Sequence, residues 1–250
     1  MSPLLIGCIA FLWLFGAGYV SNRLRSILPD HHLNADTKDT VKLAMGLVAT
    51  MTALVLGLLV ASAKGTYDAE KAGVVSMSAK FVVLDRVLAH YGPEAKPARD
   101  LLREVVGQMR DELWPDKSRP SQLDPSKSSG EALYDALQSL EPGDDARRLL
   151  KTEGLQIAFA LGQMRWLMFA QSGGSISGPL LAVVLCWLSI LFFSFGLFAP
   201  PNSTALSSLL VSALSVSGAI FLILELDQPF DGLIHISETS IRLAMDHLGR

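Results

Sequence analysis

Four long runs without a charged side chain constrain what this chain can fold into. The runs Pro3–Val20, Leu43–Ala63, Pro179–Ala199 and Ala205–Leu224 contain no Asp, Glu, Lys, Arg or His. The hydrocarbon core of a bilayer is about 30 Å thick and needs roughly 20 apolar residues in a helix, because a helix satisfies its own backbone hydrogen bonds in lipid. The sequence therefore predicts four transmembrane helices. The low share of charged residues, 18% of the chain, agrees with this prediction.

The predicted fold class is an all-α membrane protein with four transmembrane helices and a helical-bundle extramembrane domain inserted between helices two and three. The segment between the second and third runs carries 15 Lys or Arg and 16 Asp or Glu, so we expect water around it. The expected domains are a first transmembrane pair in residues 1–63 (3–20 and 43–63), the extramembrane domain in 64–178, a transmembrane hairpin in 179–224 (179–199 and 205–224), and a C-terminal turn with an amphipathic helix in 225–250.

The second apolar run is predicted to continue into the insert as one helix. Apolar residues recur there at alternating spacings of three and four once Glu70 is included, which is the pattern of a continuous seam on one helix face. Two interpretations stay open. The seam either packs inside its own domain or forms a pillar shared between subunits. Its members are Tyr67, Glu70, Val74, Met77, Phe81, Leu84 and Leu88.

Small residues gather on one face of the second apolar run. Ala49, Ala53, Gly57 and Ala61 recur at intervals of four, with two further small residues beside them. Small residues let helix backbones approach closely in lipid, and a narrow pore requires the same kind of face. If the face lines a pore, the expected lining residues are Gly46, Thr50, Ala53, Gly57 and Ala61.

Three carboxylates follow the end of the last apolar run. Glu225, Asp227 and Asp231 are either an acidic ring in an oligomer or ordinary interfacial carboxylates. No Asp, Glu, Lys, Arg or His lies within the four runs, which disfavours active transport and chemistry inside the bilayer. We therefore expect a protein that is not an enzyme and that needs no cofactor.

Two further classes of site are disfavoured. His31 and His32 lie near Asp30 and Asp36, but adjacent residues on a short loop rarely aim both rings at one ion, so we expect a solvated loop and no metal site. The net charge is −3 and no basic cluster is present, so nucleic acid is not an expected partner.

Four motifs together resemble the bestrophin-like family of bacterial membrane proteins of unknown function. The resemblance covers nearly the whole chain, and its most specific part is the last motif. It implies kinship with bestrophins, which are ring-shaped anion channels with four membrane helices per subunit. The aromatic neck of bestrophins has no counterpart, since Leu43–Ala63 holds no Phe, Tyr or Trp, so anion selectivity is not implied. The motifs are Tyr67-Asp68-Ala69-Glu70, Asp111-Glu112-Leu113-Trp114-Pro115, Pro179 with Trp187, and Glu225-Leu226-Asp227-Gln228-Pro229-Phe230-Asp231-Gly232.

The predicted function is passive conduction of inorganic ions by a homo-oligomeric channel whose pore is lined by the second transmembrane helix. The predicted location is the bacterial inner membrane, as a multi-pass protein. The alternative is a non-conducting scaffold or sensor whose helical domain binds a partner. The orientation also has two readings. Positive charge at Arg23, Arg25, Lys38 and Lys42 favours a cytoplasmic loop between helices one and two, whereas kinship with bestrophins implies a cytoplasmic insert.

Overall fold

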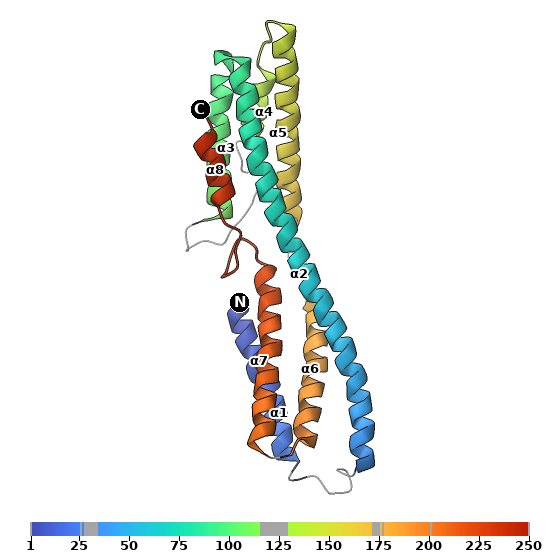
Figure 1. Ribbon diagram of the computed structural model, residues 1–250. Coiled ribbons are helices and arrows are strands. Elements are labelled where there is room, and N and C mark those ends of the chain that lie inside the picture. The colour runs from blue at the N-terminus through green and yellow to red at the C-terminus, as the bar shows by residue number, and fades with distance from the viewer. Residues whose placement is uncertain are drawn as a thin grey trace. The chain divides into compact units, whose positions relative to one another are not determined.

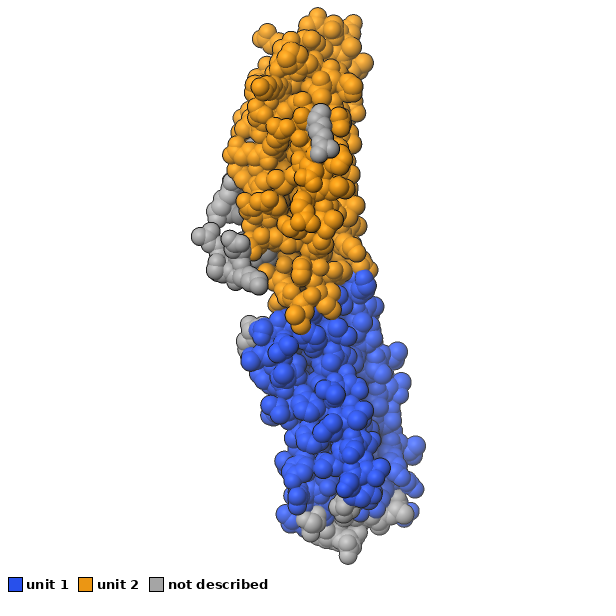
Figure 2. Space-filling model, turned by 60° about the vertical axis from the view of Figure 1, so that its left-hand side comes forward, with its two compact units in different colours: residues 1–66, 175–227 blue, residues 67–174, 228–250 orange. Residues whose placement is uncertain are grey.

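The structure, a computed structural model, describes residues 2–25, 27, 35–115, 130–171, 176, 178–200 and 202–249. It divides into two compact units (Figure 2). Unit 1 comprises Met1–Thr66 and Ser175–Asp227, and unit 2 comprises Tyr67–Gly174 and Gln228–Arg250. Every regular element in the described ranges is a helix, in agreement with the predicted all-α class.

Unit 1 contains the apolar helices (Figure 1): α1 (Pro3–Leu24), the first part of α2 (Ala35–Tyr91), α6 (Gly178–Phe198) and α7 (Ser203–Leu226). Each of these four helices is long and apolar enough to cross a membrane, which confirms the prediction of four such segments. Local signals set their ends. Pro3 lies in the first turn of α1, where a missing N–H costs nothing, and the Asn202 side chain accepts the Ala205 N–H at 2.8 Å as the N-cap of α7.

Helices α1 and α6 pack with their backbones close together. A methyl group at Gly196 of α6 would overlap the carbonyl oxygen of Gly18 and the hydroxyl group of Ser21 on α1. The Asn22 side chain donates to the Gly196 carbonyl at 3.0 Å and to that of Ala199 at 3.3 Å. Because the last carbonyls of a helix have no partner within it, this contact satisfies the C-terminal end of α6.

Unit 2 is a bundle formed by the second part of α2 with α3 (Lys96–Leu113), α4 (Gly130–Gln138), α5 (Asp145–Gln171) and α8 (Thr239–His247). A short 3-10 helix, η2 (Pro93–Ala95), follows Gly92, whose φ of 126° suits a residue without Cβ. The core of unit 2 includes the α2 residues Val74, Met77, Phe81, Leu84 and Leu88 together with buried residues of α3, α4, α5 and α8.

The α2 seam therefore packs inside its own unit. The burial of these residues within unit 2 agrees with a seam that packs inside its own domain, and not with a pillar shared between subunits. Glu70 occupies its place in the row and is buried. The sequence pattern predicts a short helix over residues 131–140 with Ser128 as its cap; helix α4 ends at Gln138, and Ser128 lies outside the described residues.

The C-terminal residues are fastened to unit 2 by the carboxylate of Asp85. Arg99 donates to both Asp85 oxygens at 2.8 Å, and the Gly249 N–H donates to one of them at 3.0 Å. Arg103 also donates to the Leu248 carbonyl at 3.0 Å. Burial alone raises the pKa of Asp85, but the hydrogen bonds from Arg99 and Gly249 and the positive charge of Arg99 and Arg103 outweigh it and hold the pKa below its ordinary value.

Candidate functional site

The first candidate site is the face of α2 that the sequence predicted to line a pore. The opposite face of α2 packs into unit 1 through Thr52, Leu59 and Ala63, all of which are buried. Each predicted lining residue is exposed in the single chain: Gly46, Thr50, Ala53, Gly57 and Ala61. We call these five residues the small-residue strip.

No part of the described chain packs on the glycines of this strip. A methyl group added at Gly46 or Gly57 would meet no heavy atom within 4 Å outside the helix itself. The Thr50 hydroxyl donates to the Gly46 carbonyl at 2.8 Å, so it needs no outside partner for its proton. The strip is therefore apolar or internally satisfied, and it is open to another molecule.

A second exposed strip runs beside the first. Successive residues of an α-helix are about 100° apart around its axis, which places Leu47, Leu54 and Leu58 on the adjacent part of the exposed surface. All three are exposed. We call them the leucine strip. The outward surface of α2 thus has one half with almost no side-chain volume and one half with large aliphatic side chains, and these two halves suit different surroundings.

The three carboxylates of the possible acidic ring have different environments. Glu225, in the last turn of α7, is only 2% exposed. Asp227 is the half-buried C-cap of α7, and Asp231 is exposed in unit 2. A carboxylate that lines a water-filled axis must reach water, and only Asp231 is fully exposed in the single chain.

Two of the motifs behind the family resemblance meet within unit 2. The rings of Trp114 and Phe230 pack edge-on, with centroids 5.8 Å apart, and the Trp114 indole N–H donates to the Ile236 carbonyl at 2.7 Å. Gly232 has a φ of 95°, which turns the chain between Phe230 and Ile236. Phe230 is thus half-buried against Trp114 within unit 2.

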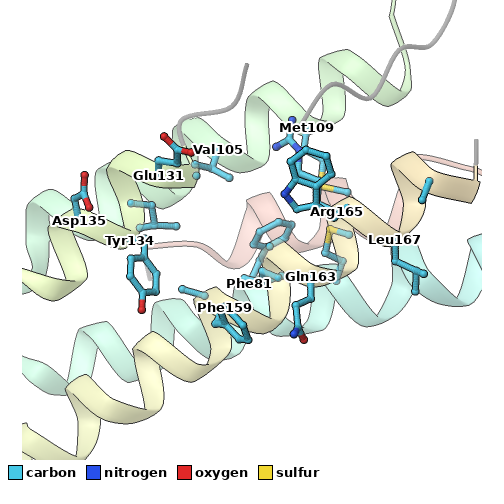
Figure 3. Close-up of a pocket in the computed structure, with 18 residues that line it drawn as sticks. Phe81, Val105, Met109, Glu131, Tyr134, Asp135, Phe159, Gln163, Arg165 and Leu167 are labelled. Carbon is cyan, nitrogen blue, oxygen red and sulfur yellow. The ribbon is translucent and has the colours of Figure 1, made fainter. Parts of the chain in front are cut away.

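A pocket of about 1100 Å³ opens between α2, α3, α4 and α5 of unit 2 (Figure 3). Its lining is mostly apolar and includes Met77, Phe81 and Met109, with Tyr134 and Arg165 among the polar residues. Arg165 is buried and donates to Glu112 at 2.5 Å. The sequence does not predict this pocket. Helical periodicity shows which residues face the inside of the bundle, but not where their side chains leave a space between the helices.

The described residues hold no group of three or more His, Cys, Asp or Glu side chains that could bind a metal ion. Asp30, His31 and His32, which were considered as ligands, lie outside the described residues, and Asp36 is exposed at the start of α2.

The chain belongs to the bestrophin-like family, because the Bestrophin-like domain matches residues 10–241. The match begins at Ala10 within α1 and covers the other three apolar helices and unit 2 up to Ile241 in α8. The family is associated with membrane channels rather than with enzymes, and the chain is a membrane protein. No curated protein and no solved structure matches the chain.

Proposed function

We propose that the chain forms a homo-oligomeric ion channel in which α2 of each subunit lines a common axis. The observation that carries this proposal is the exposure of the small-residue strip. A helix that packs only within its own chain turns its smallest residues toward its neighbours, since close approach maximises van der Waals contact in lipid. Here α2 turns them away from its own chain.

The leucine strip supports the same arrangement. Lipid tails suit large aliphatic side chains, whereas a narrow aqueous axis requires residues with little volume, so the two halves of the α2 surface fit an oligomer with lipid outside and a pore within. The pore-lining residues are then Gly46, Thr50, Ala53, Gly57 and Ala61. Conduction is passive, because no charged side chain lies in the membrane part of α2 to couple it to an energy source.

The remaining parts of the proposal concern placement. The chain is a multi-pass protein of the inner membrane, and unit 2 with its charged surface stands in water as the extramembrane domain between the second and third membrane helices. Of the candidate acidic residues, Asp231 is the one with the exposure that a ring requires, whereas the buried Glu225 fits a structural role. Inorganic ions are the transported species.

The proposal is tested by ion flux from liposomes that contain the purified protein. We expect flux with the wild type and a loss of most of it with Gly57→Leu, because a leucine from each subunit would fill the axis. Gly16→Leu is the matched control, since Gly16 is also a membrane-helix glycine at which an added methyl group meets nothing within 4 Å, but it lies on α1.

Two results would contradict the channel. A wild type that releases no ions, or a protein that is monomeric by mass in detergent and in the bilayer, leaves no axis for α2 to line. The alternative function, a scaffold or sensor whose helical domain binds a partner, would then be preferred. Equal flux in Gly57→Leu and Gly16→Leu would show that the small-residue strip does not line the pore.

A further inference from the structure

The C-terminal end of α5 carries large apolar side chains that remain exposed, although Trp166 and Leu167 also line the pocket of unit 2. Trp166 and Leu167 are each 57% exposed, and Phe169 is 42% exposed. Trp166 and Phe169 pack edge-on with ring centroids 5.9 Å apart. Exposed aromatic side chains on a domain that stands in water need a reason, because burying each one would remove a large apolar area from water.

This end of α5 leads along the chain into the apolar helix α6. Gln171 ends α5 and Gly178 begins α6, so the link between them spans at most about 25 Å. The contacts inside unit 2 agree, since a methyl group at Gly73 of α2 would lie 3.9 Å from the sulfur of Met168. α2 is one unbroken helix, and Gly73 is about 15 Å along it from Ala63, where the uncharged part of α2 ends.

The charge pattern marks the same boundary. Arg165 is the last charged residue before Glu225, so the uncharged stretch that contains α6 and α7 begins within α5, at Trp166. Arg165 itself is buried and paired with Glu112 inside unit 2. The exposed side chains past this point are therefore apolar or uncharged. A segment that enters the headgroup region of a bilayer has this composition.

A second exposed apolar side chain lies at the same end of unit 2, because Arg165 pairs with Glu112 next to Trp114, and the loop after α7 packs on Trp114 through Phe230. Leu233 is 72% exposed and follows α7, which ends at Leu226. The contact of Phe230 with Trp114 and the Trp114 hydrogen bond to Ile236 hold this loop against the end of α3. Two segments distant in sequence, each adjoining a membrane helix, thus present apolar side chains at one end of unit 2.

We propose that Trp166, Leu167 and Phe169, together with Leu233, insert into the headgroup region of the bilayer and seat unit 2 on the membrane surface. Tryptophan and other amphipathic aromatic residues favour this zone, where the ring meets the upper acyl chains and the polar edge meets water. A lipid surface fits better than a second copy of the chain, because both segments adjoin membrane helices and no charged residue follows Arg165 until Glu225. The inference requires the chain to lie in a bilayer but does not require it to conduct ions.

The test measures contact with lipid at chosen positions in the full chain. With Cys8 and Cys186 replaced by serine, single cysteines at Trp166, Phe169 or Leu233 are labelled with an environment-sensitive fluorophore, and the protein is placed in liposomes. Phosphatidylcholine bearing a nitroxide high on the acyl chain is the quencher. Leu149→Cys is the matched control, since Leu149 is also highly exposed on α5 but about 25 Å along the helix from Trp166.

We expect quenching at positions 166, 169 and 233 that is several-fold stronger than at position 149. Quenching equal to that at position 149 would overturn the proposal. A label that is shielded from water but insensitive to the nitroxide lipid would also overturn it, since the cover would then be protein. If the labelled variants fail to fold, quenching of native tryptophan fluorescence by brominated lipid, compared between the wild type and Trp166→Phe, gives the same decision. Ion flux is not measured, so a failure here is distinct from a failure of the channel proposal.

Discussion

Trp114 and Phe230 pack edge-on, with their rings 82° apart in orientation, at the place where the chain leaves its last membrane helix and joins unit 2. The pair brings together two motifs, D-E-L-W-P and D-Q-P-F-D-G, that lie far apart in the sequence. The element after α7 is thus held by an aromatic contact and by the hydrogen bond from the Trp114 indole N–H to the Ile236 carbonyl, and Pro229 and Gly232 shape the turn.

The Trp114 and Phe230 rings are expected to be energetically coupled. Trp114→Phe retains a ring but leaves the Ile236 carbonyl without its donor, which costs about 1 kcal/mol, and Phe230→Ala removes a half-buried ring at a cost of about 3 kcal/mol. A double-mutant cycle between Trp114→Ala and Phe230→Ala, measured by thermal unfolding in detergent, should give a coupling of about 0.5–1.5 kcal/mol. Strictly additive effects would mean that the rings do not stabilise each other.

Gly196→Ala is expected to destabilise unit 1. The added methyl group cannot fit against the Gly18 carbonyl and the Ser21 hydroxyl, so α1 and α6 must separate, at a cost near the upper end of about 1–3 kcal/mol for overpacking. Gly218→Ala on α7 is the control, because its methyl group meets nothing within 4 Å. The midpoint of unfolding in detergent should fall for Gly196→Ala and stay level or rise for Gly218→Ala. Equal midpoints would show that the α1–α6 contact is loose.

Asp85→Asn is expected to destabilise unit 2 in a pH-dependent way. The Asp85 side chain is 1% exposed, and that of Arg99 is 22% exposed. Breaking the pair costs about 3 kcal/mol, the lower end for a buried pair, because Arg99 stays partly in water. The pKa of Asp85 is lowered below its ordinary 3.8 in the folded chain. Its contribution to stability is therefore complete above pH 3.8 and is lost as the pH falls through the folded pKa.

The stability gap between the wild type and Asp85→Asn should thus be constant from about pH 5 to 8 and close only below pH 3.8. Thermal unfolding across this range measures it, and Asp100→Asn is the control, since Asp100 is exposed and 3.8 Å from Arg103. A gap that already narrows near neutral pH would mean that Asp85 is not held ionised by its arginine neighbours.

The small-residue and leucine strips of α2 are expected to differ in their reaction with water-soluble thiol reagents. In a chain without Cys8 and Cys186, cysteines at Thr50 and Gly57 should react several-fold faster with a charged reagent in liposomes than cysteines at Leu54 and Leu58. The reason is that a pore supplies water to the first pair, while lipid covers the second. All four residues are exposed in the single chain, so equal rates would show that the two strips have the same surroundings.

The sequence predicts the membrane helices and the family correctly for physical reasons. A bilayer admits only long uncharged helices, so the four runs leave little choice, and the bestrophin-like resemblance is confirmed over residues 10–241. Arg165 within the apolar stretch of α5 disfavours a fifth crossing, since a charged side chain is costly at the centre of a bilayer. In the structure Glu112 neutralises the buried guanidinium, which a bilayer interior would not do.

Other features were beyond a single sequence. Between Leu43 and Ala63, α2 has no charged residue on any side, so periodicity cannot tell which side packs into unit 1. The contact between Trp114 and Phe230 joins two motifs whose spacing says nothing about their pairing. The seam of α2 was compatible with packing inside the unit or between subunits, and only the positions of α3, α4 and α5 decide between these possibilities.

The unbroken course of α2 over 57 residues has a mechanical consequence. A regular helix transmits rotation about its axis along its whole length, because each turn is hydrogen-bonded to the next. A change in side-chain packing around Met77 or Phe81 that twists the helix would therefore swing Gly57 and Thr50 through a similar angle. In the proposed channel, a change in the packing of unit 2 would in this way alter which α2 residues face the pore.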